Sequence, residues 1–96
     1  MFIVSLNYIK PLEEIEKYLP AHIQFLEKYY AQGNFVMSGR KIPRTGGVII
    51  INAENRAQAE NIISEDPFHQ ANLAEYTIIE FIPSKTSPDL AQYQQS

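Results

Sequence analysis

The feature that most constrains the fold of this chain is the order in which two hydrophobic periodicities follow one another. Strand-like alternation or β-branched runs occupy residues 2–8, 34–42, 48–53 and 73–82. Apolar residues at spacings of three and four, typical of amphipathic helices, follow the first and the third of these segments. The sequence therefore predicts the element order β-α-β-β-α-β.

This order is that of an α+β, ferredoxin-like fold, in which four antiparallel strands form one sheet and two helices cover one of its faces. A chain of 96 residues holds one hydrophobic core and is too short for a second domain. We expect the ferredoxin-like domain to cover residues 1–83. Residues 84–96 are polar and carry no apolar stripe, so we expect a C-terminal tail there.

The first helical stripe is interrupted by a proline. Because Pro20 has no N–H and collides with the preceding turn, we expect a short helix over residues 12–18 and then a kink or restart. A longer helix would carry Pro20 in its first turn and run to about residue 32, where Gly33 can end it. The whole stripe consists of Leu12, Ile15, Leu19, His22, Leu26 and Tyr29.

The second strand-like segment has two faces of different character. Its alternation places Phe35 and Met37 on one face. The other face then carries Val36, Ser38 and Arg40. We expect this strand to end in a loop that precedes the third strand.

The third segment, residues 48–53, is almost entirely β-branched and follows a predicted loop over residues 43–47, so we expect a central strand. Apolar side chains occur on both faces of the first, third and fourth strands. Two helices on one face of the sheet cannot cover all of them. We therefore expect a homodimer that forms through the open sheet face. The sequence does not decide between a dimer and a higher oligomer built from such dimers.

Composition excludes several classes of function. The chain contains no cysteine, which excludes disulfides and cysteine nucleophiles and favours a cytoplasmic location. Eight basic and 11 acidic residues give a net charge of −3, which argues against nucleic-acid binding. The longest apolar run, residues 48–51, is far too short to span a bilayer, and the N-terminus shows no targeting signal. We therefore expect no membrane association.

His22 is the most informative single residue, because it lies on the apolar stripe between Leu19 and Leu26. A buried imidazole without a partner would cost about 1–3 kcal/mol, so we expect a hydrogen bond to it. A backbone carbonyl in the core would satisfy the ring without any functional role. A carboxylate would instead fix the tautomer and leave the second ring nitrogen free for proton transfer.

Asp66 is the candidate carboxylate. It stands before Pro67 at the end of the second helix, where its side chain can cap the amides that follow. The two helices lie side by side in this fold, so Asp66 and His22 can also meet near one end of the sheet. The cap and the acid/base pair are both open interpretations.

The segment from Ser38 to Gly47 concentrates three of the eight basic residues and three of the four glycines. Backbone amides and guanidinium groups are what an anion pocket needs, since arginine binds carboxylate or phosphate through two bonds. The alternative is a solvated hairpin whose cations discourage edge pairing. The candidate ligand-binding residues in this segment are Ser38, Gly39, Arg40, Arg44 and Gly47.

Other kinds of site lack support. Asp66 and His69 have the spacing of two metal ligands, but nothing nearby completes a set of three or four, so we expect no metal. The chain has no nucleophile elbow, P-loop or dinucleotide fingerprint, and we expect no cofactor. RNA-recognition domains share the element order, but residues 48–51 lack the stacking aromatics that such domains need.

Four further segments are informative together, namely residues 19–26, 38–39, 43–47 and 65–68. In this order and spacing they resemble the YCII-related (YciI-like) family, and the resemblance covers residues 1–83. It implies a dimeric α+β barrel of ferredoxin-like protomers, in which a histidine and an aspartate are the proposed active-site pair. His22 and Asp66 are the matching positions. Many relatives have proline after Gly39, whereas this chain has Arg40, which favours an anionic ligand.

The resemblance implies a cofactor-independent enzyme of lyase or isomerase type that acts on a small anionic cyclic or aromatic compound. His22 would move the proton, Asp66 would set its tautomer, and Ser38, Arg40 and Arg44 would hold oxygen atoms of the substrate. The family's assigned chemistry is the removal of chloride and a proton from a chlorinated hydroxyhydroquinone. The alternatives are a non-catalytic binding or accessory dimer that uses the same pocket, and a purely structural dimerisation module.

Overall fold

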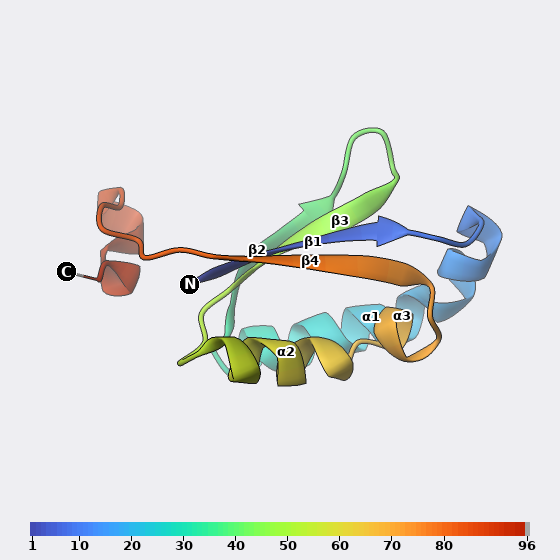
Figure 1. The fold of residues 1–96 in the computed structure, drawn as a ribbon, viewed down its shortest axis with the longest axis horizontal. Helices are drawn as coiled ribbons and strands as arrows, with labels where there is room; N and C mark the ends of the chain where they lie inside the picture. The colour runs from blue at the N-terminus through green and yellow to red at the C-terminus, as the bar shows by residue number, and fades with distance from the viewer. Residues whose placement is uncertain (96) are drawn as a thin grey trace.

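The computed structural model describes residues 1–95 and confirms the α+β, ferredoxin-like order. The four strands form one antiparallel sheet in the order β2-β3-β1-β4, and the α-helices lie together on one face of it (Figure 1). The central position predicted for the third strand is therefore confirmed. The elements are β1 (Phe2–Tyr8), α1 (Leu12–Ala31), β2 (Phe35–Arg40), β3 (Gly46–Ile51), α2 (Arg56–Ser64), α3 (Pro67–Gln70), β4 (Ala74–Glu80) and a 3₁₀ helix, η1 (Pro88–Tyr93).

The core lies between the sheet and the helices. Alternate residues of β1 and β3 point toward the helices, and Val4 and Ile51 are completely buried there. From the helices, Ile15 and Ala59 reach the same layer without solvent contact. Burial of this one apolar face is what fixes the helices against the sheet.

The first helix is continuous from Leu12 to Ala31, so of the two alternatives predicted at Pro20 the restart is wrong and the kink remains (Figure 1). Figure 1 shows its first turns set at an angle to the rest. Pro20 is exposed, and Ile15 before it and Phe25 after it are both buried, so core packing holds the two halves in one helix. Gly33 adopts a φ of 82°, the left-handed conformation that ends a helix.

The second strand differs from the sequence prediction in its faces. A β-bulge between Phe35 and Met37 shifts the register of β2 against β3. Phe35 packs into the core, whereas Met37 lies on the open face with 53% of its surface exposed, so the prediction that they share a face is wrong. Ser38 and Arg40 consequently lie on the helix side of the sheet.

The third strand begins at Gly46, earlier than predicted, and only residues 41–45 form the loop. A Cβ atom at Gly46 would lie 1.8 Å from the Leu6 carbonyl oxygen. Only glycine therefore lets β1 and β3 pair at this point. The helix that follows begins with a cap, since the Asn55 side chain accepts a hydrogen bond from the Gln58 amide at 2.8 Å.

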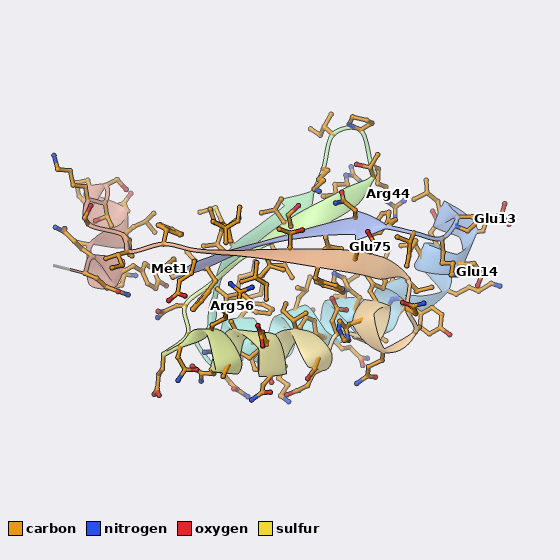
Figure 2. The ribbon with its side chains drawn as sticks, in the orientation of Figure 1. Met1, Glu13, Glu14, Arg44, Arg56 and Glu75 are labelled. Carbon is orange, nitrogen blue, oxygen red and sulfur yellow. The ribbon has the colours of Figure 1, made fainter. Side chains whose placement is uncertain are left out.

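The open face of the sheet, from which side chains project away from the helices (Figure 2), carries a row of apolar residues paired across the strands. Ile79 in this row is 51% exposed, and Phe81 just beyond β4 is also exposed. The dimer expected from this face stays a prediction. The row runs across all four strands and consists of Met37, Ile50, Ile3 and Ile79.

Beyond β4, the chain extends away from the sheet and ends in the 3₁₀ helix (Figure 1). A bond of 2.9 Å from the Gln95 amide to the Pro83 carbonyl closes this segment on itself. In this arrangement the tail lies at the end of the molecule that carries the N-terminus. No helix within residues 1–95 is both long and apolar enough to cross a membrane.

Candidate functional site

The site is built around a hydrogen bond between α1 and the turn that joins α2 to α3. The Nδ1 atom of His22 lies 2.8 Å from Oδ1 of Asp66. Asp66 is the N-cap of α3, and its backbone, held extended before Pro67, aims the carboxylate at α1. The Asp66 side chain is completely buried, and that of His22 is 12% exposed. The structure thus brings the two residues together.

Asp66 is also the helix cap that its sequence position predicts. Its Oδ1 accepts a second bond, of 3.0 Å, from the amide of Phe68. Its Oδ2 accepts a bond of 2.7 Å from the hydroxyl of Tyr76 on β4. Three donors therefore satisfy this buried carboxylate and hold it in one orientation.

Tyr76 remains a donor over a wide pH range. Burial raises the pKa of its phenol far above the usual range, and the adjacent charge of Asp66 raises it further. The hydroxyl therefore keeps its proton and its bond to Oδ2.

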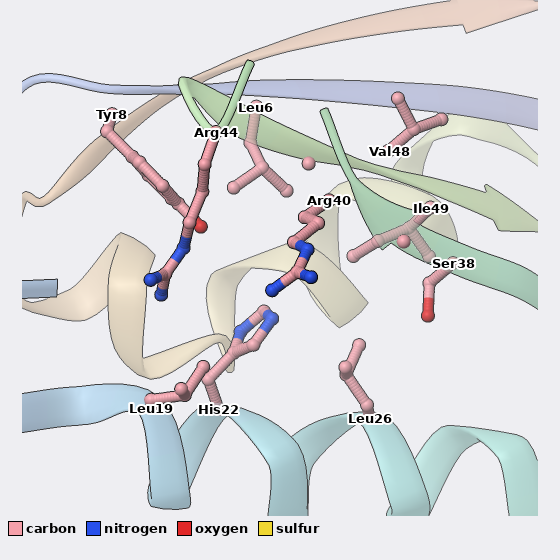
Figure 3. A pocket seen from close by; sticks show the side chains of 12 residues that line it. Leu6, Tyr8, Leu19, His22, Leu26, Ser38, Arg40, Arg44, Val48 and Ile49 are labelled. Atoms are coloured by element: carbon pink, nitrogen blue, oxygen red, sulfur yellow. The ribbon is translucent and has the colours of Figure 1, made fainter. Parts of the chain in front are cut away.

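The imidazole of His22 is held on its flat face as well as at its edge. Phe68 stacks on the ring, with centroids 4.1 Å apart and planes 4° from parallel. Because the carboxylate of Asp66 can only accept, Nδ1 carries the proton in neutral His22, and the lone pair lies on Nε2. No group in residues 1–95 bonds Nε2. Figure 3 shows the ring reaching from α1 toward the guanidinium of Arg40.

His22 forms part of the wall of a cavity of about 290 Å³ between α1 and the sheet (Figure 3). All five candidate ligand-binding residues from the second strand and its loop, which are Ser38, Gly39, Arg40, Arg44 and Gly47, line the same cavity. Asp66 does not line it and instead lies behind His22. The remaining walls are apolar apart from Tyr8, and consist of Leu6, Leu19, Leu26, Val48 and Ile49.

The cavity is cationic. None of the residues that line it is acidic, although the chain has a net charge of −3. Within residues 1–95, Arg40 has no hydrogen-bond or ion-pair partner, and Arg44 has one contact, of 3.3 Å, to Glu16. The hydroxyl groups of Ser38 and of Tyr30, on α1, are hydrogen-bonded to each other at 2.7 Å. The charge of Arg40 is therefore unpaired, whereas that of Arg44 is paired by one exposed carboxylate.

Sequence reasoning missed three residues of the site. Tyr76 and Phe68 support the His22–Asp66 pair, and Tyr8 turns its hydroxyl toward the cavity (Figure 3). All three occupy positions where an aromatic residue in the core is expected. A period-two or helical pattern does not distinguish a tyrosine that binds a buried carboxylate from one that fills space, so no pattern identified Tyr8 or Tyr76. Phe68 stands in the segment 65–68 that resembles the family, but the resemblance gives it no role.

Asp66 and His69 do not form a common site. The ring of His69 packs against that of Tyr76 at 5.4 Å, and Asp66 is occupied by its three donors. Within residues 1–95, no three side chains of the kinds that ligate metals gather in one place.

The comparisons agree with this fold. A solved structure of a 5-chloro-2-hydroxyhydroquinone dehydrochlorinase from Burkholderia phenoliruptrix, in complex with 2,5-dihydroxybenzoquinone, is similar with a TM-score of 0.71. The two chains are 20% identical, over 84% of this chain and 93% of that one. Comparison with curated proteins finds no match. The family description of the YCII-related domain matches residues 1–82, and the chain therefore belongs to the YCII-related domain family.

Proposed function

We propose that this protein is a cofactor-independent enzyme that transfers a proton within a small anionic cyclic or aromatic compound, as a lyase or an isomerase does. The observation that carries the proposal is the free Nε2 of His22, which faces a cationic cavity while Nδ1 is held by Asp66. A histidine with one fixed nitrogen and one free nitrogen is the arrangement that general acid/base catalysis needs.

In the proposed reaction, Nε2 removes a proton from a carbon next to a carbonyl group. The electron pair of the broken C–H bond moves onto the carbonyl oxygen, and His22 becomes an imidazolium that the charge of Asp66 stabilises. An isomerase returns the proton to a second carbon. In a lyase the electron pair instead expels a leaving group, and the imidazolium of His22 then gives its proton to the leaving group or to water. Both paths balance without an oxidant, a reductant or a metal.

The remaining residues would hold the substrate. Arg40, Arg44 and the hydroxyl of Ser38 supply donors for its oxygen atoms, and the apolar walls match a ring. Gly39 and Gly47 line the wall without side chains and leave room for it. The structural neighbour is a dehydrochlorinase with a hydroxylated quinone bound, and this supports a ring compound as the ligand.

The proposed enzyme works as a homodimer through the open sheet face. Met37 and Ile79, at the two ends of the apolar row, are exposed, as are Phe81 and Ile82 just beyond β4, and Ile3 and Ile50 at the centre of the row are partly exposed. An apolar face of this kind is covered in a stable protein, and a second copy of the same sheet offers a matching surface. A cytoplasmic location, favoured by the absence of cysteine, is part of the same proposal and is tested by cell fractionation.

The test is proton exchange in deuterated water. Wild-type protein is incubated with hydroxylated quinones, unsaturated lactones and cyclic keto acids, and deuterium incorporation and product formation are followed by NMR. Replacing His22 with glutamine should slow exchange by about 10²- to 10⁴-fold, the usual contribution of a general base. The matched control is His69→Gln, which changes the other histidine of the chain and should leave the rate unchanged.

Full activity in His22→Gln would reject His22 as the base. Tight binding of a compound with neither exchange nor product would instead favour the non-catalytic binding dimer.

A further inference from the structure

The two arginines of the cavity stand in different electrostatic situations. Arg40 has no partner within residues 1–95, whereas Nη1 of Arg44 lies 3.3 Å from Oε1 of Glu16 on α1. Figure 3 shows Arg40 pointing toward the imidazole of His22 and Arg44 lying on the side of Tyr8. Two guanidinium groups in one cavity therefore differ in whether a carboxylate already occupies them.

We infer that the ligand carries a carboxylate group and that this carboxylate replaces Glu16 on Arg44. Arg40 then stabilises the negative charge that appears on the substrate's carbonyl oxygen when His22 removes the proton. This inference rests on the proposed function and narrows its substrate class. The ligand is then a ring carboxylate with a carbonyl group whose neighbouring carbon loses a proton.

The contact between Glu16 and Arg44 is one that a ligand can displace. It consists of a single bond at 3.3 Å, and the Glu16 side chain is 60% exposed. Exposed pairs of this kind contribute little to stability, because water screens the charges and ordering two long side chains costs entropy. The Arg44 side chain itself is only 28% exposed, and a ligand carboxylate that accepts two parallel bonds from it has the stronger interaction.

Arg40 suits the second role because its charge is unused before the reaction. As the C–H bond breaks, its electron pair moves onto the carbonyl oxygen, and negative charge appears there for the first time. A guanidinium that no carboxylate neutralises stabilises that oxygen more in the transition state than in the bound substrate. The unpaired guanidinium of Arg40 therefore lies next to the imidazole of His22, whereas that of Arg44, paired with Glu16, lies on the side of Tyr8 (Figure 3).

The test uses two probes of nearly the same shape, 2,5-dihydroxybenzoate and 2,5-dihydroxybenzamide, which differ in charge and in one acceptor oxygen that the amide replaces with an N–H₂ donor. Their affinities are measured by NMR titration of the His22 ring signals. The carboxylate should bind the wild type about 10- to 100-fold more tightly than the amide, the usual effect of a charged hydrogen-bonding partner. Arg44→Gln should abolish this preference. Glu16→Gln should tighten binding of the carboxylate several-fold and leave the amide unchanged.

The matched control is Glu13→Gln, which removes an exposed carboxylate from the first turn of the same helix but not from Arg44. It should not change either affinity. Equal affinities for the two probes, binding of neither, or the same affinity for the carboxylate in wild type and Glu16→Gln would each overturn the inference. Carboxylate preference without proton exchange on any compound supports the binding of a ligand carboxylate by Arg44, but it counts against the proposed function and against the role of Arg40 in it. Proton exchange with equal affinities does the reverse.

Discussion

Replacement of Asp66 with asparagine tests the central arrangement of the site. Asparagine has nearly the shape of aspartate, so the change removes the negative charge and little else. In the wild type, the carboxylate accepts bonds from His22, the Phe68 amide and Tyr76 at 2.8, 3.0 and 2.7 Å. Each of these bonds loses its charged acceptor in the variant, and one amide hydrogen must face a former donor.

The expected loss of stability follows from the number of bonds. A hydrogen bond to a charged group contributes about 1 kcal/mol more than one between neutral groups, so three bonds lose about 3 kcal/mol. Because the buried charge no longer has to be desolvated, part of this loss is recovered, and we expect about 2 kcal/mol. For a domain of this size that lowers Tm by roughly 10 °C. Asp66→Ala leaves three donors without an acceptor and should cost more than about 4 kcal/mol.

The assay combines urea unfolding with long-range ¹H–¹⁵N NMR, which reports the tautomer of each histidine. We expect His22 of the wild type to carry its neutral proton on Nδ1, and Asp66→Asn to raise the Nε2–H population. Asp89→Asn, which changes the other aspartate of the chain, is the matched control and should alter neither measurement. Wild-type stability together with an unchanged tautomer in Asp66→Asn would refute the reasoning.

Three further predictions concern the fold. Gly46→Ala should lose roughly 1–3 kcal/mol of unfolding free energy, because its Cβ would lie 1.8 Å from the Leu6 carbonyl oxygen. The Cβ of Gly39→Ala would meet nothing within 4 Å, so this control should be tolerated, and equal urea midpoints for the two variants would contradict the prediction. Since the folded-state pKa of Tyr76 is raised, its contribution to stability is fully present below the unfolded-state pKa near 10 and is lost above it by about 1.4 kcal/mol per pH unit. Between pH 9 and 11, the unfolding free energy of Tyr76→Phe should therefore fall less than that of the wild type. Ile79→Lys should produce a monomer in light scattering. Ile42 lies in a loop and is 97% exposed, so the control Ile42→Lys should remain a dimer, and a dimer in both variants would exclude the sheet face as the interface.

Local patterns were sufficient to predict the four strands, α1 and α2, and several of their ends, but not α3 or η1. Alternation in β1 and β4 reads directly as strand because each residue's face depends only on its neighbours in sequence. The helical stripe identified Ile15 and Tyr29 as buried, but it missed Phe25, which is 7% exposed, and it included Leu12, which is 42% exposed. A stripe gives the direction of a helix face to within about one residue position, and the partner surface decides which flank is buried.

The candidate site divides in the same way. The position of His22 on an inward stripe and of Asp66 before a proline are local facts, and they singled out the two residues that the structure places 2.8 Å apart. Tyr76 escaped notice because its partner is ten residues away in the chain and its strand pattern is that of an ordinary core residue.

The sequence by itself determined the order of the elements, the position of His22 on the inward-facing stripe of the first helix, and the concentration of basic residues in the segment 38–47. Each of these depends only on spacing or composition. Only the tertiary structure decided that Arg40 shares a cavity with His22. By strict alternation from the buried Phe35, Arg40 would lie on the open face, and the bulge in β2 turns it toward the helices. A bulge is set by how two strands pair, and that pairing depends on residues distant in the chain.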